Sequence, residues 1–485
     1  MDKQLKKNIL KGSAATSIGT ISGMVFQFLT VMILARYVTK DDLGIYVLVI
    51  VVSGMLNLLG GLGLGLTMVK YIASNIIEEK EDVLFPVLLI RAFGCLLFGV
   101  LFLLLGRHIT QIFNENLYNY AWYIIAIFIL ANFRDLFYNL MQGLKLFKQY
   151  SIVNVTSSVF RVLVILPFLI LNKLDIQNLL IIEILATFQP VFHQLLVIPF
   201  NKYLRVKPTT KSFKKVINFS IPLYLNNLVD FINNQMNIFI IGAYLNPAGV
   251  ANYDIARKVP QALKKIFSSY MVVYFPNLAA LFSNKDKKEA VNLIEKSISI
   301  FSITAILLFL FSFLFRNKLT LLLFSARYEE VSLGFALLIL NFFVDRLGNL
   351  MGFPFLPAGH PSVPTWVNAV GSVISIGLSL LLVPIYGYMG AIYALLIMNP
   401  ILAFLYYLFM LRYKINPAIK SFLKPVPLVL IAVVSLIFNT QSNLLINSLL
   451  FIFSVVLGWL ISEDFRSTLK TLVLYVHKFI QRKNR

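Results

Sequence analysis

The sequence predicts an all-α polytopic membrane protein with about fourteen transmembrane helices. Of its 485 residues, 59% are hydrophobic and only 13% are charged, and the mean hydropathy is +0.81. Soluble domains carry about 25% charged residues, so this composition does not suit a surface that faces water along its whole length. The single cysteine, Cys95, lies inside an apolar run, which excludes an intramolecular disulfide.

Apolar segments long enough to cross a bilayer recur along the whole chain. A run of about 18 or more apolar residues is the usual sign of a membrane span. The predicted spans begin near Gly12, Leu43, Phe85, Tyr118, Tyr150, Leu179, Val216, Gly249, Asn292, Val331, Ser362, Tyr388, Val426 and Leu444.

The net charge of +22 is distributed as in a membrane protein. With the amino terminus in the cytoplasm, most Lys and Arg residues fall in segments predicted to be cytoplasmic, which is the positive-inside pattern. The densest clusters are DKQLKK near the start, NKYLRVKPTTKSFKK at residues 201–215 and HKFIQRKNR at the end. Both termini are therefore expected in the cytoplasm, with basic residues against anionic lipid head groups. No basic stripe interleaved with exposed aromatic residues indicates nucleic-acid binding.

The first twelve predicted spans form two similar sets of six. ARYVTKDDLGIY (residues 35–46) aligns on GAYLNPAGVANY (residues 242–253), and FRDLFYNLM aligns on FVDRLGNLM, which pairs Asp135 with Asp345. Ordered matches of this kind support an internal repeat. A six-span unit starts and ends on the same side of the membrane, so the two copies are parallel.

This repeat sets the predicted domain organisation. The predicted parts are an amino-terminal six-helix lobe (1–200), a basic cytoplasmic link (201–215), a carboxy-terminal six-helix lobe (216–413), and two additional helices with a basic tail (414–485).

Polar residues follow one face of several predicted spans at the helical spacing of three and four. The sets in the seventh and eighth spans are Asn226, Asp230, Asn233 and Asn237, and Asp254, Arg257, Gln261, Lys264 and Ser268. Polar faces inside a membrane must meet one another or water, which predicts a hydrated cavity between the two halves. The alternative is that isolated polar residues join neighbouring helices, at about 0.6 kcal/mol each.

Cations outnumber acids within the predicted spans. The cations are Arg91, Arg134, Arg161, Arg257, Lys258, Lys264, Lys265 and Arg346, and the acids are Asp135, Glu183, Asp230, Asp254 and Asp345. An intramembrane charge costs about 2.5–3.5 kcal/mol on insertion scales, so this excess predicts an anionic ligand. Alternatives stay open: Asp254 and Lys258 have the spacing of an ion pair, and Lys264 and Lys265 could reach the membrane interface. Glu183 either pairs with an arginine or binds a coupling cation.

The charged pairs at Asp135 and Asp345 occupy equivalent positions in the two copies, but their arginines do not. Arg134 precedes its aspartate, whereas Arg346 follows it. Two residues turn a helix by about 200°, so the two arginines are expected on different sides of their repeats. The element predicted to be duplicated is therefore an Asp-x-x-x-Asn face.

The sequence favours a transporter over an enzyme. It lacks the Gly-x-x-x-x-Gly-Lys phosphate loop. It also offers no metal-ligand cluster and no nucleophile–base pair. The longest external loops, at residues 107–118 and 316–330, are too short for a catalytic domain. No cofactor is expected, and coupling to an ion stays open.

Two segments resemble a known family. LKGSAATSIGTISGMVFQFLTVMILARYVTKDDLGIY (residues 10–46) resembles the start of the polysaccharide (O-antigen, Wzx-type) flippases of the multidrug/oligosaccharidyl-lipid/polysaccharide (MOP) exporter superfamily. AGHPSVPTWVNAVGSVISIGLSLLLVPIYGYMGAIYA (residues 358–394) resembles the eleventh and twelfth spans of those proteins and of lipid II flippases. In the second segment, four residues suit close packing around a short turn: Pro384, Gly387, Gly390 and Ala391.

The resemblance implies two six-helix lobes of the MATE and MurJ type that alternate between inward-open and outward-open states. The implied substrate is an isoprenoid-diphosphate-linked oligosaccharide, which moves from the cytoplasmic to the outer leaflet for cell-surface polysaccharide synthesis. Arginine suits this substrate because its guanidinium group binds phosphate through two parallel hydrogen bonds. The expected partners are this lipid, anionic membrane lipids and the glycan polymerase or ligase machinery.

Three other functions remain as alternatives. A lipid II flippase is favoured by the fourteen spans. A multidrug or cation antiporter of the same superfamily would be expected to have an acidic cavity, but the first span has no Asp or Glu between residues 12 and 40. A membrane-embedded glycan polymerase or ligase would need a larger external loop.

Overall fold

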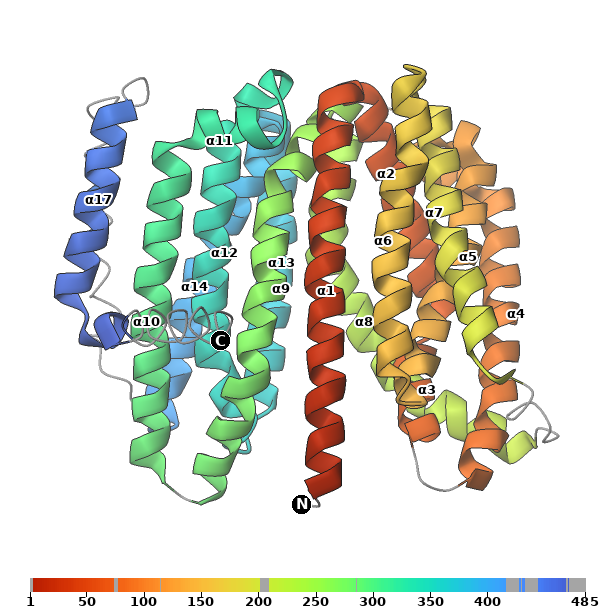
Figure 1. Cartoon of the computed structure of the whole chain (residues 1–485), viewed down its shortest axis with the longest axis horizontal. Coiled ribbons are helices and arrows are strands. Elements are labelled where there is room, and N and C mark those ends of the chain that lie inside the picture. Colours follow the sequence, from red (N-terminus) through yellow and green to blue (C-terminus); the bar gives the residue numbers. More distant parts are fainter. Residues whose placement is uncertain are drawn as a thin grey trace, which may run out of the picture. The chain divides into compact units, whose positions relative to one another are not determined.

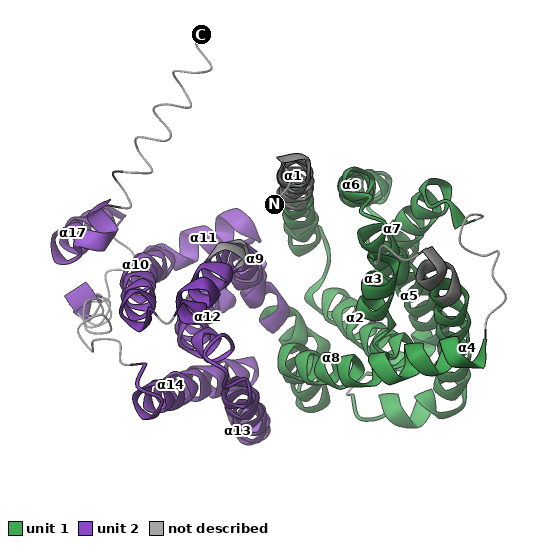
Figure 2. Ribbon diagram, turned by 90° about the horizontal axis from the view of Figure 1, so that it is seen from below, with its two compact units in different colours: residues 1–252 green, residues 253–485 purple. Residues whose placement is uncertain are grey.

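The chain folds into helices throughout the part that the computed structural model describes, which confirms the predicted all-α class. The described residues are 3–73, 77–113, 115–200, 209–284, 286–415, 427–428, 430–431, 444–467 and 470, and they contain no strand. Contacts between Cα atoms divide the chain into two compact units, residues 1–252 and residues 253–485 (Figure 2).

Unit 1 is a bundle of long helices (Figure 1). Helix α1 packs along α6, α5 packs against α3 and α7, and α8 packs across α2, α3 and α4. The helices are α1 (Lys3–Tyr37), α2 (Lys40–Gly61), α3 (Leu64–Ala73), α4 (Ile77–Thr110), α5 (Ala121–Gly143), α6 (Phe147–Ile170), α7 (Ile176–Val197) and α8 (Thr210–Tyr244), with a 3₁₀ turn, η1 (Leu117–Tyr120), before α5.

Unit 2 begins within α9, and its helices pack in an order similar to that of unit 1. Helix α14 packs against both α12 and α13, as α7 packs against both α5 and α6, and this agrees with the internal repeat. Its elements are α9 (Pro247–Ser283), α10 (Lys287–Leu314), α11 (Arg316–Leu323), η3 (Ala326–Val331), α12 (Ser332–Gly352), η4 (Phe353–Phe355), α13 (Ser362–Tyr386), α14 (Tyr388–Arg412) and α17 (Leu444–Ile461).

Ten of the described helices are long and apolar enough to cross a membrane. They correspond to ten of the predicted spans. The spans predicted near Gly12, Val216 and Gly249 form the long helices α1, α8 and α9, which carry more polar residues. The span predicted near Val426 lies mostly outside the described residues. The protein is a multi-pass membrane protein, and the predicted count of about fourteen spans is not confirmed.

The contact-based division differs from the predicted lobe boundary. The sequence places the division at the basic link of residues 201–215, of which 201–208 lie outside the described residues. In the structure α8 belongs by its contacts to unit 1, and the division falls between Asn252 and Tyr253. The predicted six-helix lobes remain a prediction about which parts of the transporter move together.

Polar side chains at the amino ends of three helices fix where those helices begin. Thr39 accepts a hydrogen bond from the backbone N–H of Asp42 (3.1 Å) at the start of α2. Asp175 accepts one from the N–H of Asn178 (2.9 Å) at the start of α7. Thr209 forms a capping box with Ser212 at the start of α8. Each cap satisfies an N–H group that the helix itself leaves unpaired.

A break separates α2 from α3 inside the second predicted span. Helix α2 ends at Gly61, and the next two residues adopt left-handed backbone angles, with φ of 48° at Leu62 and 70° at Gly63. A break at membrane depth leaves backbone carbonyl groups without helical partners, and such groups must be satisfied by other parts of the protein. The span predicted to begin near Leu43 carries no prediction of this break.

A continuous apolar core surrounds α3 in unit 1. Its buried side chains come from α3, α4, α5, α6, α7 and α8, so this short helix is enclosed by the longer ones. The core residues are Leu64, Met68, Tyr71, Ile72, Val83, Leu84, Val87, Leu136, Phe137, Leu140, Met141, Val153, Val191, Ile198 and Val216. This packing fixes the position of α3 after the break.

The short turn predicted between the eleventh and twelfth spans is confirmed. Helix α13 ends at Tyr386, Gly387 has a φ of 61°, and α14 begins at Tyr388. A Cβ atom added at Gly390 would lie 2.2 Å from the backbone oxygen of Leu382, so the two helices approach as closely as glycine allows. Only glycine fits both positions, at Gly387 because of its backbone angle and at Gly390 because of space.

We expect Gly390→Ala to lower the free energy of unfolding by about 1–3 kcal/mol, because the added methyl group must push the backbone of α13 away. The measurement is the thermal unfolding midpoint of the purified protein in detergent. Gly377→Ala is the matched control, since a Cβ atom at Gly377 meets nothing within 4 Å. The control is expected to unfold at or slightly above the wild-type temperature. Equal midpoints for the two variants would contradict the tight turn.

Helix α17, the described part of the two additional helices, packs against α10. The Asn447 side chain donates to the backbone oxygen of Leu314 (2.9 Å), and the hydroxyl groups of Ser299 and Ser462 lie 3.2 Å apart. These contacts hold the segment that contains α17 against α10. Such an attachment fits an element added to the repeated core.

Candidate functional site

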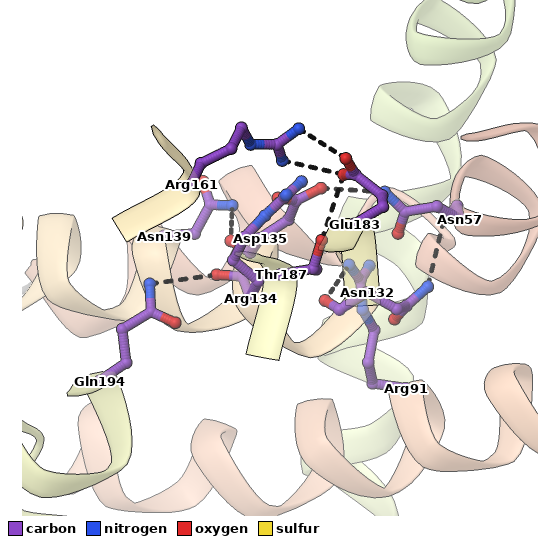
Figure 3. A network of polar contacts seen from close by, with 10 residues as sticks. All are labelled: Asn57, Arg91, Asn132, Arg134, Asp135, Asn139, Arg161, Glu183, Thr187 and Gln194. Carbon is purple, nitrogen blue, oxygen red and sulfur yellow. Dashed lines mark hydrogen bonds and ion pairs between the residues drawn. The ribbon is translucent and has the colours of Figure 1, made fainter. Parts of the chain in front are cut away.

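A network of polar side chains lies within the apolar helices of unit 1 (Figure 3). It joins residues of α2, α4, α5, α6 and α7. The sticks in Figure 3 are Asn57, Arg91, Asn132, Arg134, Asp135, Asn139, Arg161, Glu183, Thr187 and Gln194. Three guanidinium groups and two carboxylates belong to this network, so its acids do not fully balance its cations.

The strongest contact in the network is the ion pair between Arg161 on α6 and Glu183 on α7. The guanidinium Nη1 donates to Glu183 Oε2 at 2.5 Å, and Nη2 donates to Oε1 at 2.9 Å. Tyr46 on α2 donates its hydroxyl to Oε2 at 2.6 Å, and Thr187 donates to Oε1 at 3.4 Å. Of the two alternatives for Glu183, the structure therefore supports pairing with an arginine.

A second ion pair lies on α5, between Arg134 and Asp135. Arg134 Nη2 is 2.8 Å from Asp135 Oδ1. Asn57 on α2 donates to Asp135 Oδ2 at 2.9 Å, and Gln194 on α7 donates to the backbone oxygen of Arg134 at 3.3 Å. Both charged side chains of this pair remain partly exposed. The pair therefore lies where a polar ligand within unit 1 could reach it.

Arg91 on α4 has a different environment from the other two arginines. It is 5% exposed, and its guanidinium donates to two backbone oxygens, those of Gly61 (2.7 Å) and Asn132 (2.8 Å). Gly61 is the last residue of α2, so Arg91 satisfies a carbonyl group at the break between α2 and α3. A cation at the carboxy end of a helix is also favourable toward the helix dipole. These contacts give Arg91 a structural role beside its predicted role as a substrate ligand.

The Asp-x-x-x-Asn face is duplicated in the structure, as the sequence predicts. The Asn139 amide donates to the backbone oxygen of Asp135 at 2.6 Å, and Asn349 donates to that of Asp345 at 2.8 Å. Arg346 on α12 also forms an ion pair with Asp345. Each copy therefore contains an arginine–aspartate ion pair, formed by the preceding arginine in one copy and by the following arginine in the other.

Unit 2 contains a further charged cluster on α9. Asp254 is buried and lies between two cations of its own helix, 3.0 Å from Arg257 Nε and 2.7 Å from Lys258 Nζ. The i,i+4 ion pair considered for Asp254 and Lys258 is therefore present. Two cations on one carboxylate leave this cluster with a net positive charge.

Other predicted site residues lie on helix surfaces. Three polar residues of α8 and two of α9 are exposed, and they are Asn226, Asp230, Asn233, Gln261 and Lys264. Lys265 is also exposed on α9. Asn237, the last residue of the α8 set, is buried instead. Apolar residues of the same part of α8 are exposed as well, among them Leu225 and Val229, so the exposure does not single out the polar set and its predicted role stays a prediction.

The structure brings into the network several residues that the sequence does not identify as site residues. Asn57 is an isolated polar residue in an apolar run, whereas Asn132 and Thr187 stand close to the charged residues Arg134 and Glu183 in the chain. Tyr46 contacts Glu183 and belongs to the segment that aligns between the two repeats. Their shared signal was a polar group on an otherwise apolar span, which also occurs at simple helix contacts. Among the described residues, no group of three or more His, Cys, Asp or Glu could hold a metal ion.

Solved structures share this architecture. The chain is similar to a lipid II flippase MurJ in an inward closed conformation, at 16% identity over 95% of this chain and 99% of that chain, with a TM-score of 0.69. It is similar to an inward-facing multidrug resistance MATE family transporter of the MOP superfamily, at 14% identity over 81% and 94%, with a TM-score of 0.67. The MATE transporter VcmN of Vibrio cholerae matches at 14% identity over 85% and 96%, with a TM-score of 0.57.

The long apolar helices are arranged as in these solved structures, so the chain has a MurJ- and MATE-like fold. The sequence shows the family to which the chain belongs. It belongs to the polysaccharide biosynthesis protein family, whose model matches residues 9–282. This confirms the resemblance found in the sequence. A comparison with curated proteins finds no match.

Proposed function

We propose that this protein is a flippase that moves an isoprenoid-diphosphate-linked oligosaccharide from the cytoplasmic to the outer leaflet by alternating access. It acts as a transporter and not as an enzyme. Membership of the polysaccharide biosynthesis family supports an oligosaccharide intermediate of polysaccharide synthesis as the substrate. The fold shared with a lipid II flippase supports transport of a large lipid-linked substrate.

The observation that carries this proposal is the Arg161 guanidinium within the membrane-spanning part of unit 1. Its side chain is 26% exposed and already holds an anion through two hydrogen bonds, the Glu183 carboxylate. Phosphate is bound by arginine in the same two-point manner. The partly exposed Arg134 belongs to the same network (Figure 3). A diphosphate group would therefore meet two guanidinium groups there.

The remaining predicted ligands keep secondary roles in this proposal. Arg257, Lys258, Lys264 and Arg346 contribute positive charge along the path of the substrate, whereas Arg91 acts through the backbone oxygens of Gly61 and Asn132. The polar residues Asp135, Asn226, Asp230, Asn233, Asp254, Gln261 and Asp345 keep that path hydrated or position the cations. Any coupling ion would act through the acidic members of this set.

The test is translocation by the purified full-length protein in proteoliposomes. The substrates are a fluorescent oligosaccharide on an isoprenoid diphosphate, the same glycan on an isoprenoid monophosphate, and fluorescent lipid II. We expect the diphosphate-linked oligosaccharide to move faster than the monophosphate-linked glycan, because the latter forms fewer charged hydrogen bonds. Equal rates for the two would overturn the role of the diphosphate.

The same assay separates the alternatives. Faster transport of lipid II than of the polysaccharide intermediate would favour the lipid II flippase, which the structural similarity to MurJ keeps as the second candidate. Transport of a cationic drug with no movement of either lipid would favour a multidrug antiporter. The proposed partners are anionic membrane lipids and the glycan polymerase or ligase that uses the translocated lipid.

We expect both termini to lie in the cytoplasm of a multi-pass protein in the cell membrane. The reason is the concentration of Lys and Arg in the segments predicted to be cytoplasmic. Reporter fusions in the predicted basic link of residues 201–215 and at the carboxy terminus should both give a cytoplasmic signal. A fusion after Lys173, in the turn between α6 and α7, serves as the opposite-side control. An external signal from either of the first two fusions would contradict this topology.

A further inference from the structure

Glu183 holds the Arg161 guanidinium in the geometry that a phosphate group would use. Two nitrogen atoms of one arginine donate to two oxygen atoms of one anion, at 2.5 and 2.9 Å. Each guanidinium edge can serve only one anion in this two-point manner. A carboxylate and a phosphate on that edge are therefore mutually exclusive.

The two partners differ in how accessible they are. The Arg161 side chain is 26% exposed, whereas the Glu183 side chain is 9% exposed. An anion that approaches through the accessible part of this contact meets the arginine before it meets the glutamate. The position of the guanidinium thus suits exchange of one anion for another.

Glu183 has other hydrogen-bond donors that would remain after it loses Arg161. The Tyr46 hydroxyl donates to Oε2 at 2.6 Å, and the Thr187 hydroxyl donates to Oε1 at 3.4 Å. Tyr46 comes from α2 and Thr187 from α7, so neither donor is carried by α6, although Arg161 Nη1 also donates to the Tyr46 hydroxyl at 3.5 Å. A carboxylate released by its arginine would not be left without hydrogen bonds, and this lowers the cost of the exchange.

We propose that Glu183 is an internal competitor that occupies the substrate's phosphate position on Arg161 when no substrate is bound. Binding of the diphosphate replaces the carboxylate on Arg161, and return of the carboxylate expels the diphosphate at the end of transport. This inference rests on the proposed function, because it assigns Glu183 a role at the same anion site. It predicts that binding becomes tighter and release slower when the competing charge is removed.

The decisive variant is Glu183→Gln, which keeps the size of the side chain and one acceptor oxygen for Tyr46 or Thr187, replaces the other oxygen with an NH2 group that can donate to the second hydroxyl, and removes the charge. The probe is farnesyl diphosphate, a short isoprenoid diphosphate, added to the purified full-length protein in detergent, with farnesol as the uncharged comparison. We expect Glu183→Gln to bind farnesyl diphosphate at least about 10-fold more tightly than the wild type, with little change for farnesol. We also expect slower translocation by this variant in proteoliposomes.

Asp175→Asn is the matched control. It removes one negative charge from the same stretch of chain, at the cap of α7, and asparagine retains the capping hydrogen bond. Its affinity for farnesyl diphosphate should equal that of the wild type. If both variants bind farnesyl diphosphate more tightly, the gain results from the change in net charge alone, and the proposed role of Glu183 is overturned.

The outcomes separate this inference from the function on which it rests. Loss of farnesyl diphosphate binding in Arg161→Ala, together with tighter binding in Glu183→Gln, supports both. If Arg161→Ala loses binding of farnesyl diphosphate while Glu183→Gln binds it with wild-type affinity, the anion site is supported and the competition by Glu183 is overturned. Unchanged binding in Arg161→Ala overturns the anion site itself. If Glu183 served only to pack α6 against α7, Glu183→Gln would lower the unfolding temperature and would not raise the affinity.

Discussion

Replacing Arg161 by alanine is expected to reduce translocation of the diphosphate-linked oligosaccharide by about 100-fold. The variant loses both the positive charge and the two parallel donors on the substrate's phosphate. Arg161→Lys keeps the charge but loses the planar pair of donors, so it should fall between alanine and the wild type. The measurement is the initial rate in proteoliposomes at equal protein, or surface glycan in a flippase-deficient strain, normalised to the protein found in the membrane.

Stability must be separated from transport in this experiment. Removing Arg161 leaves the Glu183 carboxylate buried without its cation, and breaking a buried ion pair in this way typically costs about 3–5 kcal/mol. The double variant Arg161→Gln with Glu183→Gln removes both charges and keeps two polar side chains in contact. We expect it to recover most of the stability and none of the transport. Recovery of transport together with stability would show that the pair serves only to hold α6 on α7.

Replacing Arg91 by alanine is expected to destabilise the protein by about 2–5 kcal/mol, because two buried backbone carbonyl groups lose their donors. These are the carbonyls of Gly61 and Asn132, and the Gly61 carbonyl lies at the break between α2 and α3. Arg91→Lys can satisfy only part of this arrangement and should give an intermediate loss. The measurement is the thermal unfolding midpoint in detergent.

The control for Arg91 is Arg107→Ala, which removes a cation from the exposed end of the same helix. It should unfold at the wild-type temperature. In Arg91→Ala, transport per folded molecule should stay close to normal. A stable Arg91→Ala protein that fails to transport would instead support the role that the sequence suggests, in which Arg91 binds the substrate anion.

Features that depend on local spacing could be predicted from the sequence. The Asp-x-x-x-Asn pattern places an amide one helical turn after an aspartate, and both copies form the hydrogen bond from Asn139 or Asn349 to the preceding turn. The short turn at Gly387 follows from glycine spacing in the same way. The helical class and most spans follow from apolar runs, because a bilayer admits few other ways to satisfy the backbone.

Features that depend on contacts between distant helices could not be predicted. Arg91 is separated by 30 residues from Gly61 and by 41 from Asn132 in the chain, and nothing in its local sequence identifies backbone carbonyls as its partners. The sequence therefore predicts an anionic ligand, an ion pair or the membrane interface for these cations, but not backbone oxygens. The break after α2 had a visible signal, the glycine-rich stretch GGLGLG at residues 60–65. That signal is ambiguous, because glycine also occurs in unbroken membrane helices where two helices approach closely.

The two ion pairs of unit 1 differ in when the growing chain can form them. Arg134 and Asp135 are neighbours on α5, so their charges can pair as soon as that helix forms in the translocon. Arg161 and Glu183 lie on different helices, so the charge on α6 has no carboxylate partner from this pair until α7 has been synthesised. Since an unpaired charge raises the cost of entering the lipid, α6 and α7 would be expected to leave the translocon together, as a hairpin already closed by its salt bridge.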